Sequence, residues 1–415
     1  MPPAEPDSTA SWARLATCLA LSTIGGVSMW SAVVVLPAVQ TEFGVDRGAA
    51  SLSYTAVMLG IAVGSVLMGR LTDGYGVRRP LLGAWAALAA GYALAGLSGA
   101  LWQFALVHFA LIGLLGGSVT FGPLMAYVSL WFRRRRGLAV ALFAAGNYLA
   151  GVIWPPVLQH FVLTSGWRPT YIGVGLFCAA TVLPLALTLR GQPPAADAPG
   201  ARADRSVSAL GMSPGLLQAL LVVAGFACCA AMATPQVHIV AYCSDLGYGA
   251  ARGAEMLSLM LGLGIISRVG SGWLADRIGG LRTLLLGSVL QGLALLLYVG
   301  FTGLQALYAI SALFGLVQGG LIPSYAVVVR ECFPARDAGA RIGLVLMATL
   351  VGMAVGGWMA GVIDDWAGGY RGSFAAGVLW NAVNAAIVLG LLLRQRWRSE
   401  AAPAGPGFPS LPLRG

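Results

Sequence analysis

The chain has 415 residues, of which 58% are hydrophobic and only 10% are charged, and its formal charge is +10. A soluble domain carries about 25% charged residues, so this composition excludes a soluble enzyme, a disordered chain and a disulfide-stabilised scaffold. All 25 basic residues are arginines, which excludes Schiff-base lysine chemistry and a phosphate-binding P-loop lysine.

Twelve apolar segments follow one another along the chain, and each can cross about 30 Å of hydrocarbon as a helix. They are apolar nearly all round, as lipid-embedded helices are. We read the first as a retained span, since neither a basic region nor a cleavage site precedes it. The predicted spans are 15–38, 51–72, 80–99, 102–130, 137–161, 169–189, 214–237, 253–274, 282–301, 305–329, 340–363 and 372–393.

A stretch rich in Pro, Ala, Asp and Arg at 190–213 separates the sixth span from the seventh and is typical of a flexible linker. We therefore expect an all-α membrane protein with twelve transmembrane helices in two pseudo-symmetric six-helix halves. These halves are 1–189 and 214–393, and a disordered cytoplasmic tail is expected at 394–415.

The arginines predict the orientation of the spans. With an inside N-terminus and alternating spans, twenty arginines fall inside, four fall outside, and Arg268 lies within a span. The positive-inside rule then places both termini in the cytoplasm of an inner or plasma membrane. The run Arg133–Arg136 is expected to contact anionic headgroups rather than nucleic acid, and the six cysteines, most of them in apolar runs, are expected to be structural.

The loops after the second and eighth spans share residue types at a constant offset of 203 residues. An offset of about half the chain is what two parallel halves would produce. In such a loop the first glycine lets helices meet closely, the acid accepts bonds from a neighbouring helix end or an arginine, and the second glycine permits a tight turn. The pairs are Gly69 and Gly272, Asp73 and Asp276, Gly76 and Gly279, and Arg79 and Arg282.

These motifs resemble a known family. GRLTDGYGVRR at 69–79 resembles the signature between helices two and three of the major facilitator superfamily. WFRRRRGLAVALFAAG at 131–146 and GWR at 166–168 resemble monocarboxylate transporters and their bacterial oxalate/formate-antiporter-like relatives. The resemblance implies alternating access in two halves, with Asp73, Arg79 and Asp276 in cytoplasmic latches.

Arg268 is the strongest candidate for substrate binding. A charged arginine at mid-membrane costs about 2.5–3.5 kcal/mol, so it normally faces a cavity or a partner. Its own helix offers no acid within one or two turns, where Gly264 and Gly272 stand. The guanidinium is thus available to grip a carboxylate, which is also the role that the resemblance implies. The alternatives are snorkelling toward the cytoplasm and a structural bond to backbone carbonyls.

The chain departs from its proton-coupled relatives. The resemblance implies an acid one turn before this arginine and a lysine in the first helix, but here the acid position is Gly264 and there is no lysine. We expect weak or absent acid stimulation, although a proton stays a candidate co-substrate. His238, at the outer end of the seventh span, is a candidate gate or proton-linked residue.

Other polar or aromatic residues within the spans are candidates to line the substrate path, or to serve only as structural contacts between helices. The further candidates are Asn147, Tyr148, Ser118, Phe121, Gln318 and Tyr325.

The sequence predicts a secondary active or facilitative transporter of small organic anions, above all monocarboxylates, working as a monomer in a lipid bilayer. We expect no cofactor, no metal and no nucleic-acid partner. The alternatives are an exporter of amphipathic or drug-like compounds and a transporter-like membrane sensor. An enzyme is not expected, because the acids are scattered and none pairs with a histidine at ligand spacing.

Overall fold

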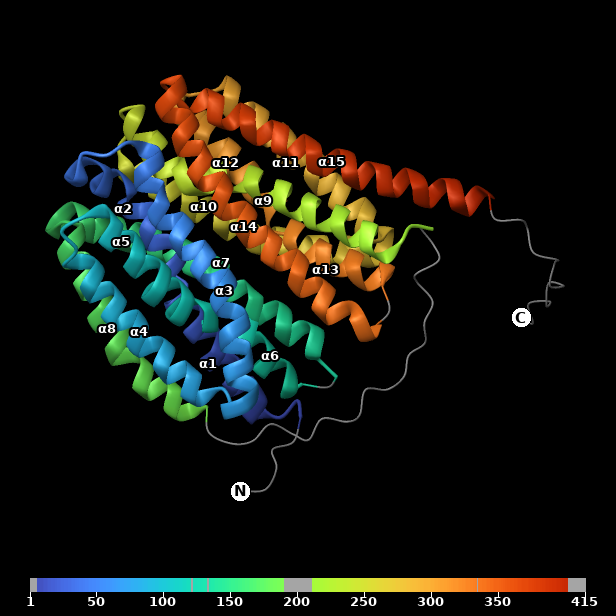
Figure 1. The fold of residues 1–415 in the computed structure, drawn as a ribbon, viewed down its shortest axis with the longest axis horizontal. Coiled ribbons are helices and arrows are strands. Elements are labelled where there is room, and N and C mark those ends of the chain that lie inside the picture. Colours follow the sequence, from blue (N-terminus) through green and yellow to red (C-terminus); the bar gives the residue numbers. More distant parts are fainter. Residues whose placement is uncertain (1–5, 121, 133, 190–210, 334, 402–415) are drawn as a thin grey trace.

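The computed structural model describes residues 6–120, 122–132, 134–189, 211–333 and 335–401, and the regular elements among them are all helical. Two helical bundles lie side by side, the first coloured blue to green and the second yellow to red (Figure 1). The first bundle ends before the predicted linker and the second begins after it, so the all-α architecture expected from the composition is confirmed. Residues 190–210 of that linker lie outside the described part.

The N-terminal bundle contains the first six predicted spans. Its elements are α1 (Thr9–Gly25), α2 (Val27–Phe43), α3 (Arg47–Tyr75), α4 (Arg78–Gly96), α5 (Leu101–Val107), the π-helix η1 (His108–Gly116), the 3-10 turn η2 (Gly117–Thr120), α6 (Gly122–Leu130), α7 (Arg136–Ser165) and α8 (Trp167–Thr188).

The C-terminal bundle repeats the arrangement with α9 (Pro214–Asp245), α10 (Ala250–Ile278), α11 (Gly280–Gly300), α12 (Leu304–Gln318), α13 (Leu321–Cys332), α14 (Ala335–Ala367) and α15 (Tyr370–Ala401). The last helix projects beyond its neighbours (Figure 1). The predicted tail 394–415 therefore begins as helix, which corrects the expectation of disorder for 394–401, while 402–415 lie outside the described residues.

Ten helical stretches in the described part are long and apolar enough to cross a membrane. They correspond to ten of the twelve predicted spans. The other two are α4 and α8, which stand at the third and sixth positions and pack against each other. With them, each half has its six predicted spans.

Two predicted spans are broken rather than continuous, and they occupy equivalent places in the two halves. The fourth span passes from α5 through a π-helix and a 3-10 turn into α6, where Pro123 lacks an amide hydrogen for a continuous ladder. The tenth span breaks between α12 and α13 at Gly319 and Gly320, just before Pro323. Apolar periodicity does not reveal such breaks, because both segments are apolar throughout.

The two halves meet through α3 against α14 and α7 against α10. The α3–α14 contact is close where α3 begins, because a side chain on Gly361 would come within 3.0 Å of the Arg47 carbonyl oxygen. We call this end of the bundle, with the turns after α7, α9 and α14, the Arg47 end. The opposite end, where α8 ends before residue 189 and where α9 begins after residue 211, is the linker end.

Candidate functional site

Arg268 lies in the middle of α10, half-buried, and its contacts come from both halves. Its Nη1 donates to the carbonyl oxygen of Ala144 in α7 at 3.0 Å, and its Nε donates to the carbonyl oxygen of Gly319 at 3.3 Å. Its guanidinium carbon lies 4.4 Å from the ring centroid of Tyr148 in α7. The arginine is therefore held where the halves meet, at mid-helix.

The charge of Arg268 has no carboxylate partner among the described residues, whose ion pairs all lie elsewhere. Its Nη2 makes no hydrogen bond to the described residues, and it is not enclosed as a buried unpaired atom would be. The bonds to backbone carbonyls that we gave as an alternative are thus present, but they use only Nε and Nη1 of the guanidinium. One edge of the guanidinium stays free to bind an anion.

The break between α12 and α13 provides the carbonyl oxygen of Gly319, which Arg268 binds within the C-terminal half. The amide of Gly320 donates to Ser267 Oγ at 3.2 Å, and a side chain on Gly319 would lie 2.0 Å from the Gly264 carbonyl oxygen. Glycine at position 319 is what lets the broken helix approach α10 closely enough to offer its carbonyl.

Gln318 and Tyr325 are turned into the C-terminal bundle and bond there. The amide oxygen of Gln318 accepts from Gln236 Nε2 at 2.5 Å, and Gln318 Nε2 is left buried without a partner among the described residues. The Tyr325 hydroxyl donates to Asn384 at 2.6 Å. These contacts do not connect either residue to Arg268, so their predicted contact with substrate stays a prediction.

Of the N-terminal candidates, Tyr148 and Asn147 come closest to the Arg268 site. Tyr148 is 5% exposed beneath the guanidinium, whereas the Asn147 amide has only a weak contact with the Met29 sulfur at 3.9 Å. Ser118 is fully buried, and its hydroxyl donates to the carbonyl oxygen of Leu114 in the preceding π-helix η1. Phe121 lies outside the described residues.

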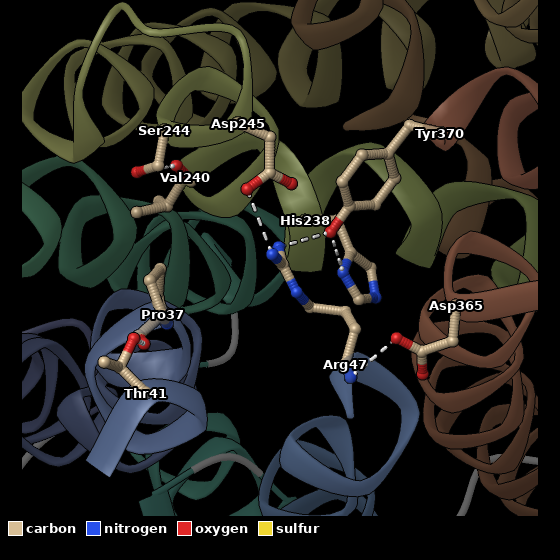
Figure 2. A network of polar contacts seen from close by, with 9 residues as sticks. All are labelled: Pro37, Thr41, Arg47, His238, Val240, Ser244, Asp245, Asp365 and Tyr370. Atoms are coloured by element: carbon tan, nitrogen blue, oxygen red, sulfur yellow. Dashed lines mark hydrogen bonds and ion pairs between the residues drawn. The ribbon is translucent and has the colours of Figure 1, made fainter. Parts of the chain in front are cut away.

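A second cross-half site surrounds Arg47 at the start of α3 (Figure 2), and Arg47 is 7% exposed there. Its Nη1 donates to the Tyr370 hydroxyl at 2.8 Å, and its Nη2 donates to Asp245 at 3.1 Å. The carboxylate of Asp365 accepts the amide hydrogens of Arg47 and Gly48 at 2.8 and 2.6 Å. An acid of the C-terminal half thereby caps the N-terminus of an N-terminal helix.

His238 continues this network into the C-terminal half. It is fully buried, with Nε2 at 2.7 Å from the Gly357 carbonyl oxygen and Nδ1 at 3.0 Å from the Tyr370 hydroxyl. A carbonyl only accepts, so Nε2 carries a hydrogen, and in the neutral ring Nδ1 accepts from Tyr370. The Tyr370 hydroxyl then accepts from Arg47 and donates to His238 (Figure 2).

Sequence reasoning missed this network, because it assigned Arg47 to topology alone. A signal was available: Asp245 and the pair Asp364–Asp365 lie at the predicted outer ends of the seventh and eleventh spans. Three acids at helix ends on one side of a membrane indicate a cation nearby. Nothing in the sequence, however, identifies which helix supplies it.

The repeated loops take the same backbone turn in both halves. Gly76 has φ +73° and Gly279 has φ +87°, which agrees with the predicted need for glycine there. At the second loop the carboxylate of Glu331 caps α11 by accepting from the Gly280 amide at 3.0 and 3.1 Å. Arg79 and Asp276 are exposed, and the side chain of Asp73 lies outside the described part, so their latch role stays a prediction.

Comparison with known proteins agrees with this architecture. The family model of the Major Facilitator Superfamily matches residues 18–301 and 269–413. Monocarboxylate transporter 13 of Bos taurus is 31% identical over 347 residues, which cover 79% of this chain and 77% of that protein. Agnestins efflux protein AgnL12 of Paecilomyces divaricatus is 28% identical over 300 residues, covering 70% and 67% of the two chains.

The fold also matches solved structures. A crystal structure of the peptide transporter POT in complex with sulfate superposes with a TM-score of 0.73, covering 93% of this chain and 95% of that one at 14% identity. These matches, with two halves of six helices and the paired glycine turns, show that the chain belongs to the Major Facilitator Superfamily and is related within it to the monocarboxylate transporters.

Proposed function

We propose that this transporter carries small monocarboxylates and holds the substrate carboxylate on Arg268. The observation that carries the proposal is a mid-helix guanidinium with no acidic partner among the described residues and one free edge. An uncompensated charge at this depth is costly, and a bound carboxylate would offset that cost by two charge-assisted bonds. A single cationic side chain matches a substrate with one carboxylate better than a substrate with two.

The arrangement of the halves supports alternating access around this site. Hydrogen bonds between described residues of different halves lie at the Arg47 end and at the level of Arg268. With the Arg47 end placed outside by the arginine distribution, this arrangement corresponds to a state closed to the outside, with both termini in the cytoplasm. Rocking the halves would break the Arg47 contacts and open the site to the other side.

The proposal is tested by reconstituting two variants, Arg268→Ala and Arg268→Lys, in proteoliposomes. The measurement is the uptake of a labelled monocarboxylate. We expect uptake to fall at least about a hundredfold in Arg268→Ala and to be largely lost in Arg268→Lys, because lysine lacks the planar fork. Arg252→Ala is the matched control, since Arg252 lies on the same helix but is exposed and pairs with Glu255. Normal uptake by both Arg268 variants would refute the carboxylate site.

Export of amphipathic compounds is the second candidate, and a lateral cavity favours it. A cavity of about 620 Å³ between α1, α7 and α8 is lined mainly by apolar side chains, among them Trp154, Phe161 and Phe177. AgnL12, among the relatives, is named as an efflux protein. Efflux of a lipophilic acid from loaded vesicles that persists in Arg268→Ala, together with no uptake of small monocarboxylates by the unmodified protein, would favour this reading.

A further inference from the structure

The ring of Tyr148 lies against the guanidinium of Arg268. The guanidinium carbon lies over the Tyr148 ring, 4.4 Å from its centroid, within the range of a cation–π contact. In the plane of the fork, Nε and Nη1 are held by the carbonyl oxygens of Gly319 and Ala144. With the ring contact and the bonds at Nε and Nη1, Nη2 is the guanidinium nitrogen that has no hydrogen bond to the described residues.

Gly264 makes room for this ring. It stands one turn before Arg268 on α10, so the two positions share a face of the helix. A side-chain carbon at position 264 would lie 2.3 Å from Tyr148 Cε1 and 2.7 Å from Cδ1, closer than real carbon atoms approach. The ring thus occupies the place beside Arg268 that any other residue at 264 would fill.

We propose that Tyr148 and Gly264 form a matched pair, contributed by different halves, that positions the Arg268 guanidinium for the substrate carboxylate. This inference rests on the proposed function and deepens it, since Tyr148 here is a positioning residue that acts through Arg268. The Tyr148 hydroxyl has no hydrogen-bond partner among the described residues, so the ring carries the role. Because the pair joins α7 to α10, the site is complete only while these helices are together.

A competing explanation assigns Gly264 to helix packing alone. Its carbonyl oxygen lies where a side chain on Gly319 would strike it, at 2.0 Å, so α10 is also close to the broken tenth span here. If packing against that break were the whole reason for glycine, a methyl group at 264 would be harmful whether or not the ring of Tyr148 is present. If the ring is the reason, removing the ring removes the harm.

The test measures KM and kcat for monocarboxylate uptake in proteoliposomes. We expect Tyr148→Ala to raise KM about three- to thirtyfold, the range of a cation–π contact, and Tyr148→Phe to leave KM within about twofold. Gly264→Ala should raise KM at least as much as Tyr148→Ala, because it displaces the ring. The double variant Tyr148→Ala/Gly264→Ala should be no worse than Tyr148→Ala.

Gly270→Ala is the matched control, because it lies on the same helix with open space where a side chain would be added, and it should leave KM unchanged. A double variant with the summed defects of the two single changes, or a Tyr148→Phe defect equal to that of Tyr148→Ala, would overturn the pair. If Gly264→Ala does not reach the membrane, the contrast between Tyr148→Phe and Tyr148→Ala decides the matter.

The outcomes separate this inference from the proposed function. Loss of uptake in Arg268→Ala with an unchanged KM in both Gly264→Ala and Tyr148→Ala would overturn the matched pair alone. Normal uptake in Arg268→Ala would overturn the carboxylate site, and the positioning role would fall with it.

Discussion

Two arginines lie at contacts between the halves, and their surroundings differ. Arg47 is almost fully enclosed and meets an acid and a phenol, while a second acid caps its helix. Arg268 meets two carbonyl oxygens and a ring, and keeps an edge of its fork free. An arginine whose charge is already compensated by neighbouring groups, as in Arg47, serves to hold the halves together. An arginine at the same kind of contact without an acidic partner, as in Arg268, is available to bind an anionic ligand.

The largest expected contrast in stability is between Arg47→Ala and Arg268→Ala. Removing Arg47 should destabilise the closed Arg47 end by about 2–3 kcal/mol, because Asp245 and Tyr370 lose a charged donor. Removing Arg268 should leave the melting temperature in detergent unchanged or higher, since an uncompensated charge is removed. An equal loss of melting temperature in the two variants would contradict the distinction between a structural Arg47 and a ligand-binding Arg268.

The Arg47 end should also open in Arg47→Ala. Ser51 is fully buried there against Gly361, so Ser51→Cys, in a background without the six native cysteines, reports opening by its reaction with a maleimide. We expect labelling at least about thirtyfold faster in Arg47→Ala, the shift that about 2 kcal/mol produces. Arg168→Ala is the control, since it breaks an ion pair with Glu42 within one half. Equal labelling in the two would exclude a gate at Arg47.

An intermediate effect is expected from Tyr370→Phe, which keeps the ring and removes one hydroxyl. That hydroxyl joins Arg47 to His238, so its loss leaves a buried donor and a buried acceptor unpaired, at about 1–3 kcal/mol. The measurement is the melting temperature in detergent. Tyr242→Phe is the control, because Tyr242 packs on the same ring and its hydroxyl has no hydrogen-bond partner among the described residues. Similar melting temperatures for both would mean that the hydroxyl contributes nothing.

The comparison of the two arginines also separates what the sequence could predict from what it could not. Arg268 was identifiable, because a lone charge inside an apolar run is unusual whatever surrounds it. The turn glycines Gly76 and Gly279 were identifiable too, because a repeated loop requires the same backbone geometry twice. Each of these signals is local, and a local pattern is visible in one chain.

The partners of these residues were not identifiable. Tyr370 and Asp365 reach Arg47 from more than 300 positions away, and Tyr325 bonds Asn384, which lies 59 positions further along on α15. Which side chains meet depends on the rotation and approach of each helix. Spans that are apolar nearly all round carry no periodicity that would predict that rotation. The break at Gly319, which gives Arg268 its carbonyl partner, is hidden for the same reason.

The smallest effect should come from Asp245→Asn. The Asp245 side chain is 44% exposed, so its pair with Arg47 is screened by solvent and is worth less than about 1 kcal/mol. Arg47 keeps its bond to Tyr370, and Asp365 still caps α3. Labelling of Ser51→Cys should rise no more than about twofold to threefold, and the rise should shrink at high salt.

Glu255→Gln is the matched control for Asp245→Asn, because it breaks an exposed ion pair with Arg252 inside one half. If Asp245→Asn opened the Arg47 end as far as Arg47→Ala does, the exposed acid would hold the halves together. The enclosed bonds to Tyr370 and the cap by Asp365 would then be secondary. If Asp245→Asn speeds labelling only at low salt, the exposed ion pair contributes little to closure. The enclosed contacts of Arg47 would then be what distinguishes it from Arg268.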